Sequence, residues 1–477
     1  MPSQKKPNII LLCPDEMRAS ALGCMGNPAG ATPYLDGLAK RSVKFNRCFT
    51  NHPKCTPSRC SLLTGQYPHV GGHRTLEMPV RSHEVNLVRT LKESGYQTAL
   101  VGKNHCVDEQ TMPLTFDVDK GKAKGADTNL DPPDPPPMPI GTYYVGEENC
   151  TVEEHSDHLA TTTALACIDD FKKDDQPFFL WLNWDHPHCP YRVPAPYFGK
   201  TDRDAVPAPL PRPNLPRHAM HDQLRASYGL DEVTADDWRE LAATYLDMCS
   251  FIDDEVKRVI DHLEASGLAD DTIVIFWSDH GDFAGDYELP EKWDTCFTDN
   301  LVHIPLLIHA PGRVTPQTVE GFIETIDVLP TALALAGVEL PGGIQGKSYT
   351  PVLDGKAEKL REYAFCQGGQ EPELLELATP VDARPRPCRA YYLKQTALVA
   401  NPQINLRAKM LRGDRWKYIM RADGEEELYD LANDPGELTN LTDNPSAKDA
   451  LDTMRLAMMR KLIEAESVDP AQDYLDS

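Results

Sequence analysis

Residues 7–16 read PNIILLCPDE, an apolar run that ends abruptly in an acidic pair. The run Asn8–Leu12 has the length of one strand, and uninterrupted apolar runs of this kind are typical of strands covered on both faces. It is too short to cross a membrane, and Cys-Pro-Asp-Glu stands where a signal peptide would have small residues for cleavage. The stretch therefore predicts a buried strand that carries Asp15 and Glu16 at its carboxyl end.

The same pattern, a strand-length apolar run followed by polar side chains, occurs three more times. Thr98–Val101 precedes Lys103 and His105, Phe178–Leu182 precedes Asp185, His186 and His188, and Thr272–Trp277 precedes Asp279, His280 and Asp282. The carboxyl ends of parallel strands meet at one edge of a sheet, and open α/β sheets bind their ligands there. We therefore expect these side chains to gather in one site.

Helical patterns lie between the apolar runs. Leu87–Ser94 ends at Gly95 and Asp236–Ser266 ends at Gly267, and glycine is the residue most often found just past a helix C-terminus. Alternating strands and helices predict the α/β class, with a large, mostly parallel mixed β-sheet flanked by helices.

After Gly355 the pattern changes to short strands and a final helix. The predicted strands are Tyr363–Cys366, Lys409–Leu411, Lys417–Met420 and part of residues 422–431, and the predicted helix is Ala447–Glu466. We therefore predict a catalytic α/β domain over residues 1–355 and a smaller C-terminal α+β subdomain, with a short antiparallel sheet, over residues 356–477.

The composition excludes some partners. The formal net charge is −25, the opposite of what a nucleic-acid backbone attracts. An anionic substrate would need a local cluster of Arg, Lys and metal to overcome that field. No window approaches the roughly 20 apolar residues of a membrane helix, so we expect no membrane partner and a cytoplasmic location. The 13 cysteines are scattered and odd in number, which favours free thiols over a disulfide framework.

The strand ends and one later loop supply two pools of polar and ionisable side chains. Asp15, Glu16, Asp279 and His280 form a pool in which three carboxylates would repel one another unless a divalent cation lay among them. An acidic pair after a strand is more often a helix cap, but here two strand ends carry such pairs. Lys103, His105, His188 and Lys292 form a second pool, suited to an anion, although each also fits an ordinary packed or solvated residue.

Residues 52–65 read HPKCTPSRCSLLTG and raise the question of what Cys55 does. The gap to Cys60 suits neither a C-x-x-C redox motif nor a zinc knuckle, and a reducing compartment disfavours a disulfide. Pro57 predicts a loop that enters a helix, which places position 55 near a helix N-terminus, where anions are favoured. The residue pattern alone leaves a thiol nucleophile open.

The stretch CTPSRCSLLTG, Cys55–Gly65, resembles the signature of the type I, formylglycine-dependent sulfatases of the alkaline phosphatase superfamily. Further stretches resemble motifs of that family, in the family's order and over nearly the whole chain: PNIILLCPDE, VGKNH, PHCPY, WSDHGD, IDVLPTALALAG and ELYDLANDPGELTNL. The resemblance implies an alkaline-phosphatase-like fold and a sulfuric ester hydrolase. It also implies that a formylglycine-generating maturation enzyme oxidises Cys55 to formylglycine.

The resemblance further implies a role for each site residue. Asp15, Glu16, Asp279, His280 and the modified Cys55 would hold one divalent metal, calcium in the first place and manganese, magnesium or zinc as alternatives. One hydroxyl of the hydrated aldehyde would attack sulfur, and the other would then lose its proton to His105 and expel sulfate. Lys103 and Lys292 would stabilise the sulfate charge, and His188 with Lys292 would protonate the leaving alcohol. Arg59 would hold the diol and the metal carboxylates.

Three positions depart from the family pattern. Glu16 stands where Asp or Gln is common, His280 stands where many members have Asn, and Asn104 replaces the usual aromatic residue between Lys103 and His105. The imidazole of His280 shifts the expected preference toward transition metals.

The expected substrate is a sulfate monoester, on a carbohydrate in the first place and on another small molecule in the second, cleaved by exo action. Two alternatives are a phosphonate or phosphate mono- or diester hydrolase of the same superfamily and a catalytically silent carbohydrate-binding relative. A third is a thiol hydrolase with unmodified Cys55. Segments 131–139, 207–216 and 367–389 are expected to wall the pocket. The linkage position and the oligomeric state do not follow from the sequence.

Overall fold

The four apolar runs form neighbouring strands at the centre of one sheet. This computed structural model describes residues 5–129, 137–371 and 389–466. The strands are β1 (Asn8–Cys13), β4 (Gln97–Gly102), β7 (Phe178–Asn183) and β9 (Thr272–Trp277), and all residues of β7 and β9 are buried. They lie in the order β9-β1-β7-β4 and pair in parallel, so their carboxyl ends share one edge.

Four shorter strands complete an eight-stranded sheet in the order β12-β2-β11-β9-β1-β7-β4-β5. They are β2 (Val43–Phe45), β5 (Val118–Asp119), β11 (Leu306–His309) and β12 (Gln317–Val319). Only β11 runs antiparallel to its neighbours in this sheet. The predicted large, mostly parallel mixed sheet is therefore confirmed.

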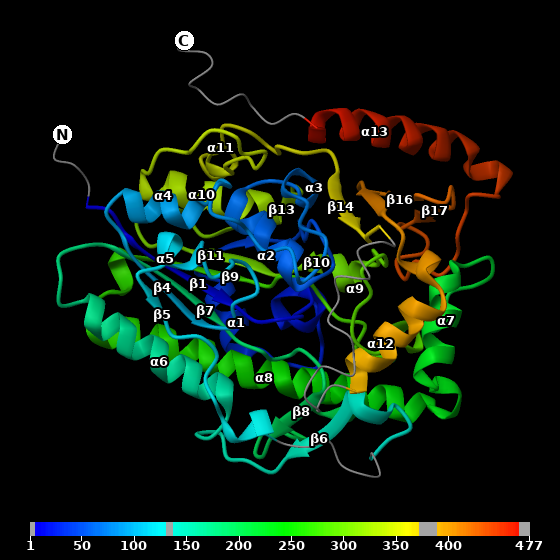
Figure 1. Ribbon diagram of the computed structural model, residues 1–477, viewed down its shortest axis with the longest axis horizontal. Helices are drawn as coiled ribbons and strands as arrows, with labels where there is room; N and C mark the ends of the chain where they lie inside the picture. The colour runs from blue at the N-terminus through cyan, green and yellow to red at the C-terminus, as the bar shows by residue number, and fades with distance from the viewer. Residues whose placement is uncertain (1–4, 130–136, 372–388, 467–477) are drawn as a thin grey trace.

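Helices cover both faces of the sheet, as Figure 1 shows. Side chains of a strand alternate between the faces, so Ile10 and Leu12 of β1 enter one hydrophobic core and Ile9 and Leu11 enter the other. The first core includes α1 (Pro33–Ala39), α6 (Ser156–Phe171) and α8 (Ala235–Ser266), and the second includes α2 (Cys55–Thr64), α4 (Leu87–Glu93) and α10 (Val328–Ala336).

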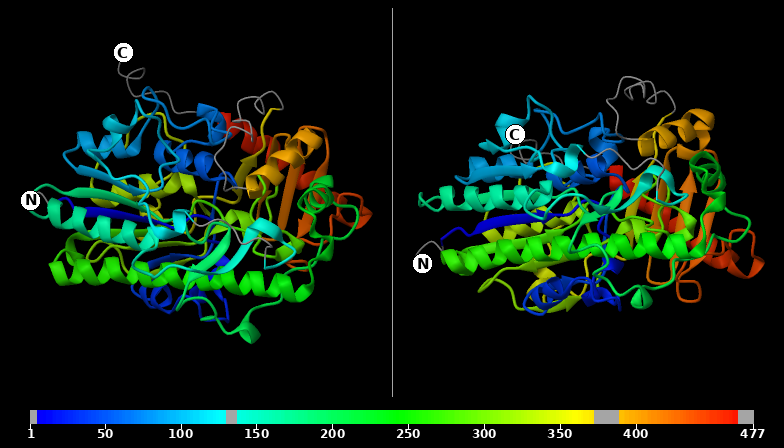
Figure 2. Two further views of the ribbon diagram at one scale, coloured as in Figure 1. Left: turned by 60° about the horizontal axis from the view of Figure 1, so that its bottom comes forward. Right: turned by 90° about the horizontal axis from the view of Figure 1, so that it is seen from below.

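The long helix α8 has clear start and stop signals. Thr234 and Asp237 form a capping box at its N-terminus, and Gly267 ends it with a left-handed backbone, φ 72°. It extends along one face of the sheet in both views of Figure 2. The helix prediction for this segment, made from periodicity and the terminal glycine, is confirmed to within one residue.

A separate antiparallel sheet follows in the C-terminal region. It contains β14 (Ala364–Gly368), β15 (Ala408–Arg412), β16 (Trp416–Arg421) and β17 (Glu426–Asp430), paired in that order. The helix α13 (Lys448–Glu466) shares a hydrophobic cluster with this sheet through residues such as Met454 and Tyr418. The predicted short antiparallel sheet is confirmed, and the domain boundary at residue 355 stays a prediction.

Smaller elements connect these parts. They are α3 (Pro68–Gly71), α5 (Met112–Thr115), α7 (Ala219–Tyr228), α9 (Asp299–Val302), α11 (Thr350–Leu353), α12 (Arg389–Ala400), β3 (Cys48–Phe49), β6 (Tyr144–Glu148), β8 (Tyr191–Pro194), β10 (His303–Ile304) and β13 (Ile323–Glu324). Among the described helices, none combines the length and the apolar character that crossing a bilayer demands. Every cysteine within the described ranges is free. Much of the segments 131–139 and 367–389 lies outside these ranges.

Candidate active site

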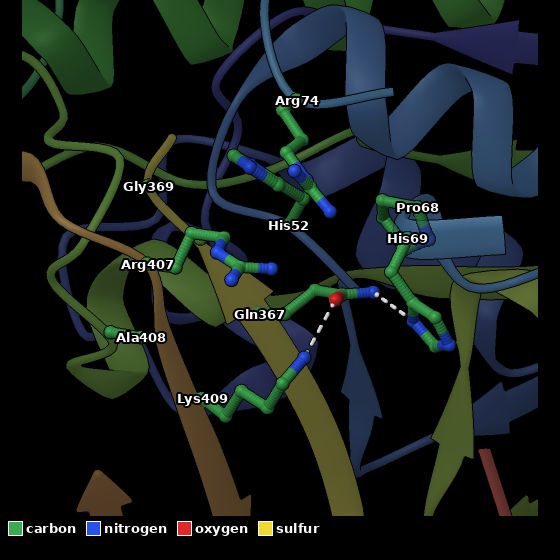
Figure 3. A pocket seen from close by; sticks show the side chains of 10 residues that line it. His52, Pro68, His69, Arg74, Gln367, Gly369, Arg407, Ala408 and Lys409 are labelled. Atoms are coloured by element: carbon green, nitrogen blue, oxygen red, sulfur yellow. Dashed lines mark hydrogen bonds between the residues drawn. The ribbon is translucent and has the colours of Figure 1, made fainter. Parts of the chain in front are cut away.

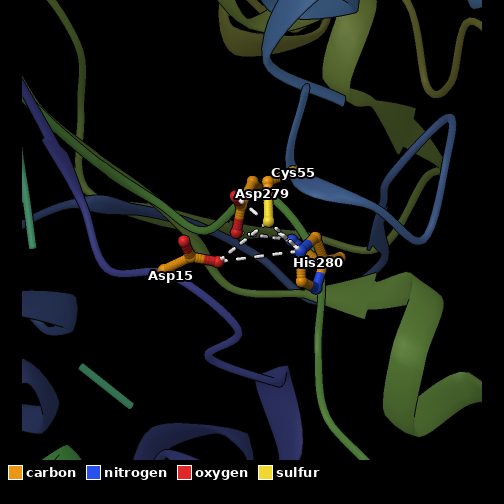
Figure 4. Close-up of side chains that lie close together, drawn as sticks. All are labelled: Asp15, Cys55, Asp279 and His280. Atoms are coloured by element: carbon orange, nitrogen blue, oxygen red, sulfur yellow. Dashed lines mark hydrogen bonds and ion pairs between the residues drawn. The ribbon is translucent and has the colours of Figure 1, made fainter. Parts of the chain in front are cut away.

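Four buried side chains meet at the carboxyl edge of the large sheet (Figure 4). Asp15 follows β1, Asp279 and His280 follow β9, and Cys55 is the first residue of α2. Each offers a ligand atom within 4.8 Å of those of the others. Nε2 of His280 lies 3.2 Å from Sγ of Cys55 and 3.7 Å from Oδ1 of Asp15. The four residues form what we call the metal-ligand group.

The position of Cys55 is fixed by the helix that it starts. All ten residues of α2 are buried, and Ser58 donates a hydrogen bond from its hydroxyl to the carbonyl oxygen of Asp279 at 2.7 Å. The hydroxyl of Thr50 donates in turn to Ser58. Burial first, and then the charge of Asp15, raise the pKa of the Cys55 thiol well above its usual range. An unmodified Cys55 is therefore a poor nucleophile at neutral pH.

Arg59 lies one helical turn after Cys55 and connects three strand ends. Its Nε donates to Oδ2 of Asp279 at 2.8 Å, a second nitrogen donates to Oδ1 of Asn183, and a third lies 3.7 Å from Oδ2 of Asp15. The side chain is fully buried. A guanidinium has donors in a rigid planar fork, so Arg59 holds both carboxylates of the metal-ligand group in fixed orientations.

Lys103 balances the charge of Asp15. Its ammonium forms an ion pair with Oδ2 of Asp15 and lies 3.8 Å from Asp185. Burial alone would raise the pKa of Asp15, but Lys103, His188 and Arg59 lower it well below its usual range. Asp279 differs, because burial and the neighbouring charge of Asp15 raise its pKa.

Glu16 does not join the metal-ligand group. Its backbone is left-handed, φ 70°, a conformation that costs a non-glycine residue roughly 1–2 kcal/mol. Two hydrogen bonds hold it there: its N–H donates to Asp279 and its carbonyl accepts from the hydroxyl of Tyr245 at 2.8 Å. The carboxylate consequently forms an ion pair with Lys292 and lies 3.4 Å from His188.

His188 and Lys292 stand together beside Glu16. Nδ1 of His188 lies on the carbonyl oxygen of Cys189 at 2.5 Å, and because a carbonyl only accepts, this nitrogen carries the proton. Nε2 is then an acceptor, and the ammonium of Lys292 lies 3.4 Å from it. Burial and the charge of Lys103 lower the pKa of His188 to about 4, so the imidazole is neutral at neutral pH.

His105 is a second neutral imidazole near the group. Burial first, and then the charges of Lys103 and Arg59, lower its pKa well below its usual range. Its Nδ1 is buried without a hydrogen-bond partner among the described residues. A neutral ring with an unused nitrogen suits a proton acceptor.

One supporting contact was not predicted from the sequence. The hydroxyl of Tyr191 donates to Oδ1 of Asp282 at 2.6 Å and accepts from the backbone N–H of Glu291 at 2.7 Å. Tyr191 belongs to β8, and Glu291 directly precedes Lys292, so this hydroxyl anchors the loop that presents Lys292. The PHCPY stretch contains Tyr191, but the sequence indicated neither a role for this tyrosine nor its partners. Asn183, the acceptor for Arg59, was likewise missed.

The metal-ligand group suits a divalent cation. It combines two carboxylates, one imidazole and the position of residue 55, all fully or almost fully buried. Hard carboxylate oxygens suit calcium, magnesium and manganese, while the imidazole suits transition metals. Two buried carboxylates this close favour the presence of positive charge between them.

Comparisons with known proteins match this chain to one family model and to several relatives. A family model described as Sulfatase matches residues 7–338. The chain is 26% identical to an ulvan-active sulfatase of Formosa agariphila over 98% of this chain and 83% of the relative. It is 27% identical to a choline-sulfatase of Rhizobium meliloti over 92% of this chain and 83% of the relative.

Solved structures show the same fold. The phosphonate monoester hydrolase SpPMH of Silicibacter pomeroyi superposes with a TM-score of 0.77 at 25% identity, covering 96% of both chains. A protein solved in complex with its substrate D-glucosamine-2-N,6-O-disulfate superposes with a TM-score of 0.75 at 20% identity, covering 98% of this chain and 99% of the other.

Proposed function

Because this chain belongs to the sulfatase family and is a sulfuric ester hydrolase, we propose that it hydrolyses a sulfate monoester on a carbohydrate, by exo action, to the alcohol and inorganic sulfate. We further propose that Cys55 is converted to formylglycine before the protein acts on its substrate. The observation that carries the proposal is the position of Cys55, at the start of a buried helix and 3.5 Å from Asp15 and 3.2 Å from His280.

The proposed cofactor is one divalent metal, with calcium first and manganese, magnesium or zinc as alternatives. Asp15, Asp279, His280 and the modified residue 55 would hold it. When bound, it would lower the pKa of a hydroxyl on the hydrated aldehyde and draw charge from the sulfate group. The ligand role predicted for Glu16 would require its carboxylate to leave Lys292, and in the described geometry Glu16 orients Lys292 instead.

The chain's own side chains would manage charge and protons. Arg59 keeps Asp279 and Asp15 in place, and the ammonium groups of Lys103 and Lys292 would stabilise negative charge on the sulfate oxygens. The ammonium of Lys292 lies 3.4 Å from the acceptor nitrogen of the neutral His188, so the proton for the leaving alcohol would come from this pair, with Lys292 as its source and a neutral amine left behind.

The second proton transfer has a separate acceptor. His105 is neutral and its Nδ1 is unused among the described residues, so it would take the proton whose loss accompanies sulfate release. One imidazole lies beside a lysine donor, and the other has an Nδ1 that no described residue uses. This difference supports an acid role and a base role at separate points.

The competing functions predict different measurements. The likeness to SpPMH and to the multifunctional alkaline phosphatase superfamily protein PehA of Trinickia caryophylli, 28% identical, supports phosphonate or phosphate ester hydrolysis as a second candidate. Rates on 4-nitrophenyl sulfate and on an aryl phosphonate ester compare the two directly. A catalytically silent carbohydrate-binding protein would turn over neither compound, and a thiol hydrolase would be inactivated by iodoacetamide.

We also propose, from the sequence-based expectation, that the protein acts in the cytoplasm, with a formylglycine-generating enzyme as its maturation partner. A tagged chain expressed at native level tests the location by fractionation. Recovery outside the cytoplasmic fraction would contradict it.

A further inference from the structure

A second pocket has two arginines and a lysine among its lining residues (Figure 3). One of its lining residues, His52, lies three positions before Cys55. We call this pocket the basic pocket and define it by His52, Arg74, Arg407 and Lys409. It gathers two arginines and a lysine on a chain whose formal net charge is −25. Local positive charge of this kind attracts an anionic ligand against the field of the whole protein.

The basic pocket is joined to the catalytic loop by backbone contacts. Gln367 in β14, which lines the pocket, donates its N–H to the carbonyl of Asn51 at 3.0 Å, and Asn51 lies four residues before Cys55. Gly368 packs so closely that a Cβ there would collide with the carbonyl oxygen of Asp294. Asp294 lies two residues after Lys292. Gly368, in the wall of the pocket, therefore packs directly against the segment that presents Lys292.

The cations of the basic pocket exceed its carboxylates. Glu371 forms an ion pair with Arg74 and lies 3.4 Å from Nε of Arg407. Lys409 donates to Oε1 of Gln367 at 3.0 Å, and no carboxylate pairs with it within the described ranges. Burial first, and then the charges of Arg407 and Arg74, lower the pKa of Lys409 to about 8. Three cations facing one carboxylate leave room for a further anion.

His52 supplies an unused polar group at the same place. It is 1% exposed, and neither ring nitrogen has a hydrogen-bond partner among the described residues. Buried polar atoms in native proteins nearly always have partners, so an orphan of this kind points to a ligand or an ordered water. Its electrostatic neighbours include both Arg74 of the basic pocket and His280 of the metal-ligand group.

The remaining histidine of the pocket is held neutral. Gln367 donates its amide N–H to Nδ1 of His69 at 3.1 Å, and Nε2 of His69 lies 3.0 Å from the carbonyl oxygen of Ala465. Nδ1 therefore accepts and Nε2 donates. The same contacts turn the carbonyl oxygen of Gln367 toward Lys409 (Figure 3). Gln367 thus fixes the lysine without neutralising it.

We propose that the basic pocket binds a second anionic group, a carboxylate or a second sulfate, carried by the same molecule whose sulfate ester is cleaved at residue 55. This rests on the proposed function and narrows it to substrates with at least two anionic groups. A positively charged alcohol would be repelled by Arg74, Arg407 and Lys409. Arg407 and Arg74 present planar forks that match carboxylate and sulfate oxygens.

The test compares substrates that differ only in the second anion. One arm uses D-glucosamine-2-N,6-O-disulfate against N-acetyl-D-glucosamine 6-O-sulfate, in which a neutral amide replaces the N-sulfate. The other uses a sulfated disaccharide with a uronate against the same compound with its carboxylate reduced to the alcohol. In at least one arm we expect kcat/KM to be about tenfold or more higher with the second anion, the effect of one hydrogen bond between charged groups.

Variants connect that preference to the basic pocket. Lys409→Met and Arg407→Gln should each lower kcat/KM for the preferred dianion about 10- to 100-fold and leave 4-nitrophenyl sulfate within about twofold. Lys356→Met, a change at an exposed lysine paired with Asp354, is the matched control. No preference in either arm, or an equal loss on both kinds of substrate, overturns the proposal.

A binding measurement separates this proposal from the proposed function. Calorimetric titration of the full chain carrying Cys55→Ala with the same four compounds needs no turnover. Tighter binding of the dianion that Lys409→Met abolishes supports the basic pocket even if no sulfate is released, whereas failure of 4-nitrophenyl sulfate turnover counts against the proposed function alone.

Discussion

Nε2 of His280 lies 3.2 Å from Sγ of Cys55, in a group of side chains that solvent does not reach. Residue 55 and the end of β9 are thereby brought together across 225 positions of sequence. If a divalent metal occupies this group, His280 is one of its ligands, and its imidazole influences which metal is preferred.

The first prediction concerns that imidazole. His280→Ala should weaken metal binding by more than the 10- to 100-fold that loss of an outer-shell partner costs, because it removes a ligand itself. Metal content after dialysis and titration with manganese measure the effect. His262→Ala, at a surface histidine paired with Asp169, is the control, and equal metal content in both variants would contradict the assignment.

Substitution of Glu16 distinguishes a role as metal ligand from a role in orienting Lys292. In the described geometry Glu16→Gln loosens Lys292 and should lower kcat about tenfold or more, the loss of one hydrogen bond between charged groups, while metal affinity stays within twofold. Asp15→Asn, at a member of the metal-ligand group, should lower metal affinity strongly. A parallel fall of metal affinity in Glu16→Gln would instead make Glu16 a ligand.

Tyr191 is predicted to support catalysis by holding in place the loop that presents Lys292. Tyr191→Phe removes the hydrogen bonds to Asp282 and to the N–H of Glu291, and leaving such buried groups unpaired costs about 1–3 kcal/mol. We expect a lower Tm together with a fall in kcat of about tenfold, because the Lys292 loop loses its anchor. Tyr197→Phe removes a partly buried hydroxyl that donates to Asp254 and should lower Tm without changing kcat. The same loss of kcat in both variants would argue against an anchoring role.

Much of the site was predictable because its chemistry follows strands in the sequence. The runs before Asp15 and Asp279 identify buried parallel strands, and parallel neighbours share one edge. The start of α2 at Cys55 also follows from the local pattern. Each of these predictions depends on residues close together in the chain.

The contacts that remained hidden join distant segments. The hydrogen bond from Tyr191 to Asp282 spans 91 positions and the one from Arg59 to Asn183 spans 124, and no periodicity reports such pairs. The left-handed backbone of Glu16 depends on a hydrogen bond to Asp279, which follows β9, and on one from Tyr245 in α8. The direction of its side chain could therefore not be inferred from neighbouring residues. The basic pocket is assembled in the same way, from separate loops and strands.

The basic pocket should respond to pH through Lys409. The charged and titratable groups that act on this lysine are Arg407, Arg74 and Cys366. Gln367 accepts a hydrogen bond from it, and its ring neighbour is Phe365. Because its pKa is lowered to about 8, its charge is lost as pH rises through that value. The ratio of kcat/KM for the preferred dianion to that for 4-nitrophenyl sulfate should therefore fall between about pH 7 and 9.

Because the two kcat/KM values are compared as a ratio, the titration of any group that affects both substrates equally cancels. Lys409→Arg keeps the charge over this range, since a guanidinium stays protonated, and should flatten the profile. A ratio that falls equally in the wild type and in Lys409→Arg would mean that another group is responsible.

The central claim is that Cys55 does not act as a thiol. Mass spectrometry of the peptide that contains residue 55, taken from a sample whose sulfatase rate has been measured, tests it most directly. The account predicts that active protein shows sulfur replaced by oxygen with loss of two hydrogens, in proportion to the rate. Full activity in a sample whose residue 55 is entirely an unmodified cysteine would contradict it.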